Sequence, residues 1–184
     1  KFGEADFSRD DIETLIRETS LGFEEIRGVT AWYEPFGLNG TTRLFCPYYN
    51  KTTGEFVFVE DSYDYTIKGS GTGWYTNVVE NGEAWIDPYY GSSAKDWFID
   101  YGVAFNYAEG PKKGQVRGII DFSLGASDFK NIVHHLSVGK TAYSYITSKT
   151  GNFISHPDAD IIGKNLKDAI ASETNSAKII MILW

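Results

Sequence analysis

The fold is decided by residues 97–124, which read WFIDYGVAFNYAEGPKKGQVRGIIDFSL. Two runs rich in strand-forming residues, Trp97 to Tyr107 and Gln115 to Leu124, flank the segment Glu109 to Gly114, which is rich in Gly, Pro and Lys. Strand formers on both sides of such turn residues predict two antiparallel strands joined by a hairpin loop. We expect the second of these strands to lie at the centre of a sheet.

A long helix is predicted before the sheet. Ser8 occupies an N-cap position with Asp11 three residues later, and Phe7 can pack against Ile12. Apolar residues then recur at helical spacing and form one stripe: Ile12, Leu15, Ile16, Phe23 and Ile26. We therefore expect one helix that continues to Arg27 and ends at Gly28.

The remaining elements are short. Strands are predicted at Val29 to Tyr33, Thr42 to Tyr48, Glu55 to Glu60, Thr141 to Thr147 and Asn152 to Ser155, and helices at Trp74 to Glu80, Ser127 to Leu136 and Leu166 to Ala171. A turn is expected at Asp87-Pro88, after the apolar run Ala84-Trp85-Ile86. The predicted elements follow the order helix, meander, helix, hairpin and helix. This order is typical of an α+β fold with a largely antiparallel sheet.

Composition excludes several classes of protein. The chain has 184 residues, with 17 Lys and Arg against 25 Asp and Glu, and a net charge of −8. Without a basic run, we expect no nucleic-acid partner. Hydrophobic residues at 42% and aromatics at 16% are enough for a compact core. No apolar stretch approaches the roughly 20 residues of a membrane span and no signal-peptide pattern opens the chain, so we expect it to be soluble.

Neither metal nor cofactor is expected. Cys46 is the single cysteine, so it cannot form an internal disulfide or a multi-thiolate site. The three histidines, His134, His135 and His156, occur without the spacing of a metal-binding motif.

Three motifs resemble those of an enzyme, but their context does not fit one. Ser92-x-x-Lys95, then Ser127-Asp128, then Lys149-Thr150-Gly151 are similar to the ordered motifs of penicillin-recognising serine hydrolases. However, Phe129 stands where that pattern needs Asn, and too few residues separate the motifs to build such an enzyme. We therefore expect no catalytic residues.

Aromatic residues and one acid form the candidate site. Trp74 and Tyr75 open the short predicted helix, with Tyr65 before them and Tyr89 after them. Asp121 lies in a strand between apolar residues, where a carboxylate needs a cation or several hydrogen-bond donors. Rings with one acid predict a pocket for a small cationic or zwitterionic molecule. For each residue taken alone, core packing, with Asp121 as a turn acid, remains the alternative.

Seven motifs, in their order along the chain, resemble the double-Cache extracytoplasmic sensor domains of microbial transmembrane receptors. They are the N-terminal helix, Tyr63-Asp64-Tyr65 before Trp74-Tyr75, Trp85-Ile86-Asp87-Pro88-Tyr89-Tyr90, Asp100 to Phe105, Gly118 to Leu124, Gly139 to Tyr143 and Gly151 to Asp158. The resemblance spans nearly the whole chain. It is closest to sensors joined to phosphatase, histidine-kinase, cyclase or chemoreceptor outputs.

The resemblance implies a domain organisation and a ligand site. It implies a signalling helix at 1–27, a membrane-distal PAS-like module at 28–137, and at 138–184 the start of a membrane-proximal module, which we expect to be incomplete. The implied ligand-binding residues are Trp74, Tyr75, Tyr89, Asp121, Tyr65 and Phe105. The parent protein would be anchored in the membrane by segments outside this chain, and a homodimer is left open.

One departure from the family pattern affects the expected ligand. Members that bind amino acids have, two residues before the Trp, an Arg that holds the ligand carboxylate, and here that position is Thr72. We therefore expect an extracytoplasmic sensor of a small molecule, an amine more than an amino acid held in the usual way. The alternative is a receptor module for dimerisation or structure, whose pocket is filled by its own side chains.

Overall fold

The computed structural model describes residues 7–67, 69, 71–91, 95–134, 143–172 and 180–183. The chain forms two compact units. Unit 1 comprises Lys1–Ile86 and Tyr101–Ser123, and unit 2 comprises Asp87–Asp100 and Leu124–Trp184. These bounds differ from the predicted modules 28–137 and 138–184, because the helix that follows the long hairpin packs against the strands of unit 2.

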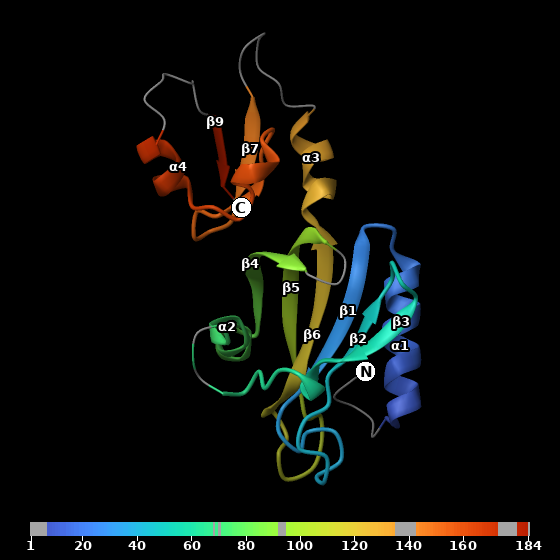
Figure 1. Ribbon diagram of the computed structural model, residues 1–184. Coiled ribbons are helices and arrows are strands. Elements are labelled where there is room, and N and C mark those ends of the chain that lie inside the picture. The colour runs from blue at the N-terminus through green and yellow to red at the C-terminus, as the bar shows by residue number, and fades with distance from the viewer. Residues whose placement is uncertain are drawn as a thin grey trace. The chain divides into compact units, whose positions relative to one another are not determined.

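The α+β class is confirmed (Figure 1). The elements in chain order are α1 (Arg9–Gly22), β1 (Ile26–Tyr33), β2 (Pro47–Asn50), β3 (Glu55–Phe58), the 3-10 turn η1 (Val59–Asp61), α2 (Gly73–Asn81), β4 (Glu83–Gly91), β5 (Asp96–Asn106), β6 (Val116–Gly125), α3 (Ala126–His134), β7 (Ser144–Thr147), β8 (Phe153–Ser155), η2 (Ala159–Ile161), α4 (Leu166–Ser172) and β9 (Ile180–Leu183). No helix in the described ranges is both long and apolar enough to cross a membrane.

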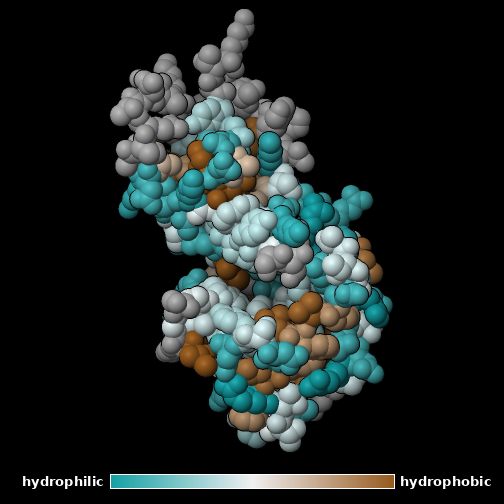
Figure 2. Space-filling view, viewed as in Figure 1, coloured by the Kyte–Doolittle hydropathy of each residue, from teal (hydrophilic) through white to brown (hydrophobic). Residues whose placement is uncertain are grey.

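A six-stranded sheet in the order β3-β2-β1-β6-β5-β4 carries the fold. The predicted central position of β6 is confirmed, since it lies between β1 and β5. The antiparallel pairing of β1 with β2 sets Gly28 opposite Asn50, and that of β2 with β3 sets Tyr49 opposite Phe56. The β3 edge is apolar: Val57 is exposed, and Figure 2 shows hydrophobic surface over β3 and the segment that follows it.

Helix α1 begins as predicted and ends earlier. Ser8 Oγ accepts the N–H of Asp11, and the Asp11 carboxylate accepts the N–H of Ser8, which completes the capping box. The predicted continuation to Arg27 is wrong. The helix ends at Gly22, Phe23 has an extended backbone, and Ile26 already belongs to β1. Pairing of the start of β1 with β2 outweighs the helical spacing of the last two apolar residues.

Two further strand predictions needed correction. The segment from Thr42 does not begin a strand, because the Asn39 side chain accepts the backbone N–H groups of Thr41 and Thr42 and holds a turn there. Strand β4 runs straight through Asp87-Pro88, where a turn was expected. Proline is tolerated there because β4 is an edge strand, with one side free of ladder hydrogen bonds.

Both faces of the sheet in unit 1 are covered. On one face α1 packs Ile12 and Ile16 against Val29, Ala31 and Tyr33 of β1. On the other face α2 packs Tyr75 and Val78 against Trp32 of β1 and Ile119 of β6. Because side chains alternate along a strand, odd positions of β1 face α1 and even positions face α2.

Unit 2 contains a three-stranded sheet in the order β8-β7-β9. Strand β7 pairs antiparallel with β8 and parallel with β9. Helix α3 supplies Val133 to a core with Ile99, Ile146 and Ile154. The predicted end of this helix and the start of the second hairpin, residues 135–142, lie outside the described residues, as does Ser92 of the hydrolase-like motif.

Close packing of β6 against β1 yields a testable requirement for glycine. A Cβ at Gly118 would lie 2.5 Å from the carbonyl oxygen of Trp32, whereas a Cβ at Gly22 would meet nothing within 4 Å. We expect Gly118→Ala to lower the free energy of unfolding by about 2 kcal/mol, and Gly22→Ala to leave it unchanged or raise it. Urea denaturation of both variants measures this, and equal stability of the two would contradict the close approach.

Candidate functional site

Four rings gather between α2 and the sheet in unit 1. Trp32 of β1 lies at their centre, with its ring centroid 5.0 Å from that of Tyr65 and 4.8 Å from that of Trp74. Tyr75 lies 5.0 Å from Tyr65. We call Trp32, Tyr65, Trp74 and Tyr75 the aromatic cluster. Edge-to-face contacts of this kind add to the stability that burial supplies, so the rings are held in fixed orientations.

Hydrogen bonds fix the polar ends of two of these rings. The Tyr65 hydroxyl donates to the backbone carbonyl of Tyr33, and the Tyr75 hydroxyl donates to Glu34 Oε1 at 2.6 Å. Burial is the main cause that raises the pKa of both phenols well above the ordinary value. Both hydroxyls therefore remain protonated donors at physiological pH, and both tie the cluster to the end of β1.

Asp121 lies on the α2 face of the sheet, beside the aromatic cluster. Its side chain is 2% exposed. The Thr30 side chain hydrogen-bonds to the carboxylate, and Trp32 also stabilises the ionised form. Nevertheless, neither Asp121 Oδ1 nor Trp32 Nε1 completes a hydrogen bond of good geometry. The carboxylate is thus desolvated and only partly compensated.

The electrostatics of Asp121 follow from this enclosure. Burial raises its pKa from 3.8 to about 6, and the hydrogen bond from Thr30 and the nearby indole N–H of Trp32 oppose that rise. Within the described part of the chain, Asp121 makes no ion pair. The nearby Cys46 thiol has its pKa raised by burial first and then by the charges of Asp121 and Glu60, so it is an inert thiol. A buried carboxylate without a cation, next to rings, is suited to an organic cation.

Thr72 precedes α2, and its hydroxyl is hydrogen-bonded within its own loop. Its hydroxyl donates to the carbonyl of Ile67 at 2.8 Å and accepts the N–H of Gly69 at 3.1 Å. The side chain is neutral and buried. At this position, then, the chain offers no positive charge to a ligand carboxylate.

The structure brings some of the predicted site residues together and separates others. Tyr65, Trp74 and Tyr75 form one cluster with Trp32, next to Asp121. Phe105 lies on the opposite face of the sheet, where it packs with Tyr33 in the α1 core. The reason is strand alternation, since Gly102, three positions earlier on β5, contacts Val78 of α2.

Tyr89 belongs to unit 2. Its hydroxyl donates to Asp100 Oδ2 at 2.9 Å, and its ring lies 6.0 Å from that of Phe98.

Three residues of this site were missed from the sequence: Thr30, Trp32 and Glu34. All lie on or just after β1, at alternate positions. The alternation of the strand was the available signal, but it shows which residues share a face with Asp121 only when β1 is known to pair with β6.

Comparison with solved structures identifies proteins that share the fold. No family model matches the sequence, and no curated protein matches it. Among solved structures, a domain described as the extracellular part of a histidine kinase, mmHK1S-Z3, superimposes with a TM-score of 0.67 at 22% identity, over 88% of this chain and 60% of that one. The chain has the fold of a receptor sensor domain.

Two chemoreceptor domains share that fold. The ligand-binding domain of the Pseudomonas aeruginosa amino acid chemoreceptor PctC, in complex with GABA, gives a TM-score of 0.58 at 15% identity over 90% of this chain and 64% of that one. The corresponding domain of the Pseudomonas fluorescens chemoreceptor CtaA, in complex with L-serine, gives 0.56 at 18% identity over 92% and 62%. The chain therefore spans about three fifths of the length of the sensor domains that it matches.

The raised pKa of Asp121 has a consequence for stability. An unfolded Asp has a pKa near 3.9, so proton binding favours the folded state between about pH 4 and pH 6. The stabilising contribution of Asp121 is fully present below that window and is lost as the pH rises through about 6. The difference in the free energy of unfolding between Asp121→Asn and the parent chain should depend on pH. Between pH 4 and pH 7.5 we expect it to shift by about 2 kcal/mol in favour of the variant. Urea denaturation at both pH values measures this, and a difference independent of pH would show that the carboxyl is not desolvated.

Proposed function

We propose that this chain is the ligand-binding sensor domain of a transmembrane receptor, lies outside the cytoplasm, and binds a small organic cation in unit 1. The shared fold with histidine-kinase and chemoreceptor sensor domains supports the class of function. The observation that carries the choice of ligand is the buried carboxylate of Asp121, which makes no ion pair among the described residues.

A bound cation would compensate the charge of Asp121. The carboxylate would hold an ammonium group, and the faces of Trp32 and Trp74 would attract the same positive charge. Such contacts are strongest in a site from which water is excluded. The site supplies this condition, because the carboxylate and three of the four rings of the aromatic cluster are buried.

The proposed ligand has no carboxylate of its own. GABA and L-serine, which the chemoreceptor domains bind, both carry one. In unit 1 the Arg43 guanidinium pairs with Asp64 at 2.7 Å, and Arg117 donates to the carbonyls of Gly37 and Leu38. The Thr72 hydroxyl is also hydrogen-bonded within its own loop. Neither of these two guanidinium groups nor this hydroxyl is therefore available to bind a ligand carboxylate. An amine or a quaternary ammonium compound fits these groups better than an amino acid does.

Strand β1 offers a route from the site to α1. Its even positions, Thr30 and Trp32, contact Asp121 and the aromatic cluster, while its odd positions pack against Ile12 and Ile16 of α1. The Tyr65 hydroxyl also holds the β1 backbone at Tyr33. A ligand that binds one arrangement of the cluster more tightly would shift its population by that difference in affinity, and α1 would carry the change to an output domain.

A matched pair of compounds tests this function. We expect choline to raise the melting temperature of the chain and to bind in calorimetry at pH 7.5, because its ammonium group compensates Asp121. The uncharged isostere 3,3-dimethylbutan-1-ol should bind at least tenfold more weakly. Since only the ionised carboxyl attracts the cation, affinity should fall about tenfold for each pH unit below about 6.

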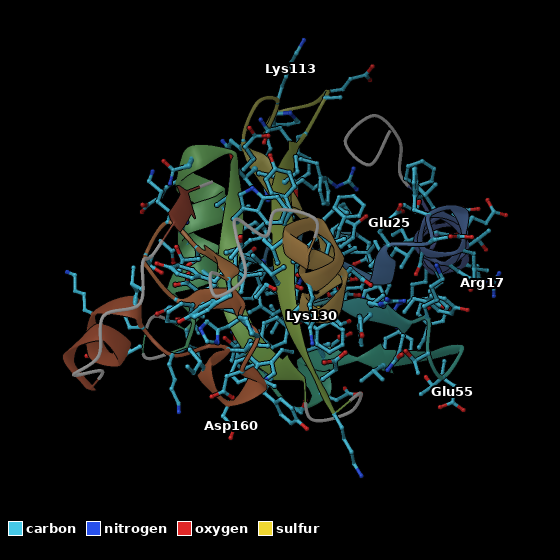
Figure 3. The ribbon with its side chains drawn as sticks, turned by 90° about the horizontal axis from the view of Figure 1, so that it is seen from above. Arg17, Glu25, Glu55, Lys113, Lys130 and Asp160 are labelled. Carbon is cyan, nitrogen blue, oxygen red and sulfur yellow. The ribbon has the colours of Figure 1, made fainter. Side chains whose placement is uncertain are left out.

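Two variants provide the controls. Asp121→Asn should abolish choline binding, while Glu55→Gln, which removes an exposed carboxylate that points away from the protein (Figure 3), should leave it unchanged. If choline and its isostere bind equally, or if Asp121→Asn still binds choline, the proposed cation site is wrong. A ligand-free dimer that takes up no tested amine would favour the assembly module instead.

A further inference from the structure

Two Asn-x-Thr sequences occur in the chain, at Asn39-Gly40-Thr41 and at Asn50-Lys51-Thr52. This pattern is the acceptor for N-linked glycans, which are added at surface positions of exported proteins. The fold treats the two sequences differently. Asn39 is exposed in the loop between β1 and β2, whereas Asn50 is 3% exposed and lies in β2, where it pairs with Gly28 of β1.

The side chain of Asn39 is held in one orientation. Its Oδ1 accepts the backbone N–H groups of Thr41 and Thr42 at 3.1 and 2.8 Å, and it accepts the Thr41 hydroxyl at 3.0 Å. Its Nδ2 makes no hydrogen bond within the described part of the chain. A bond formed at this nitrogen would therefore leave the turn intact.

An exposed ring precedes Asn39 by three residues. Phe36 is 46% exposed and has a φ of 63°. A bulky residue rarely adopts this left-handed region, and backbone strain of this kind is concentrated at functional sites. The N–H of Gly40 donates to the carbonyl of Phe36 at 3.0 Å and closes a turn over residues 36–40.

The loop is anchored between the ring and the amide. Gly37 and Leu38 are buried, and their carbonyls accept the Arg117 guanidinium at 2.9 and 3.1 Å. This anchor holds the middle of the turn against the protein and leaves Phe36 and Asn39 on the outside.

The ring of Phe36 is suited to contact a sugar. The face of an aromatic ring is flat, apolar and electron-rich, so it attracts the weakly positive C–H groups of a pyranose. Phe36 belongs to none of the core clusters in the described part of the chain. A glycan on Asn39 would cover a ring that the chain itself leaves in water.

We propose that Asn39 is an acceptor for an N-linked glycan, whose first sugar packs on the Phe36 ring. Nδ2 of Asn39 bonds to C1 of a sugar carried by a lipid-linked oligosaccharide, and the bond from C1 to the lipid phosphate oxygen breaks. The phosphate leaves with the electron pair, and one amide proton passes to a base of the transferase. The inference rests on the proposed location outside the cytoplasm but not on the cation site.

Glycan transfer to the folded chain tests the acceptor. The purified chain is incubated with a single-subunit oligosaccharyltransferase that requires only Asn-x-Thr, and with a lipid-linked oligosaccharide that begins with N-acetylglucosamine. Peptides of residues 34–44 and 45–55 serve as unfolded acceptors. We expect mass spectrometry to find both peptides modified, and the folded chain modified at Asn39 but not at the buried Asn50.

Two variants control this experiment. Asn39→Gln should remove the glycan, and Thr41→Ser, which keeps the hydroxyl, should retain it. A folded chain that stays unmodified at Asn39, or that is modified equally at Asn50, would overturn the proposal. Choline binding is measured separately, so failure of the cation site and failure of the acceptor are distinguishable.

The contact with Phe36 has its own readout. The glycan should raise the melting temperature of the chain by a few degrees. Phe36→Asn removes the ring but keeps a residue that tolerates the left-handed region, and it should abolish this increase. Phe23→Ser removes a ring that is 57% exposed before β1, whereas the loop follows β1, and it should leave the increase unchanged. An increase that survives in Phe36→Asn would overturn the packing of the sugar on this ring.

Discussion

The burial of one carboxylate is the constraint on which the site in unit 1 depends. Asp121 lies on a central strand, 2% exposed, with a hydrogen bond from Thr30 and with Trp32 beside it, and makes no ion pair among the described residues. A charge in such surroundings is destabilising unless something compensates it. The aromatic cluster and α2 enclose the carboxylate further, so a buried charge that opposes folding lies beside rings that would attract a cation.

The central strand of the fold was predictable because its signals are local. Residues 97–124 contain two long runs of strand formers around a Gly- and Pro-rich loop, and the structure places β5 and β6 there. The capping box of α1 was predictable for the same reason, since Ser8 and Asp11 are three residues apart. The early end of α1 was not, because it depends on the pairing of Gly28 with Asn50.

Part of the site was predictable, because some of its residues stand out from their neighbours in the sequence. An acid between Ile120 and Phe122, and a Trp-Tyr pair at a helix start, are visible in the sequence, and Tyr65, Trp74 and Tyr75 do come together. Trp32 occupies the centre of the cluster but lies in an ordinary strand run, so only the order of strands reveals it. Phe105 was predicted to belong to the site because its strand matches a motif of the sensor family. The alternation of side chains along β5 instead places it on the face of the sheet that α1 covers.

The measurement that tests the central claim most directly is the titration of the Asp121 carboxyl by carbon-13 NMR, with and without choline. The claim predicts a pKa of about 6 in the free chain, because burial is only partly compensated, and a clear fall in that pKa when the cation binds, because a positive charge favours the ionised form. A carboxyl that titrates near 4 in the free chain, or whose pKa does not respond to choline, would contradict the account.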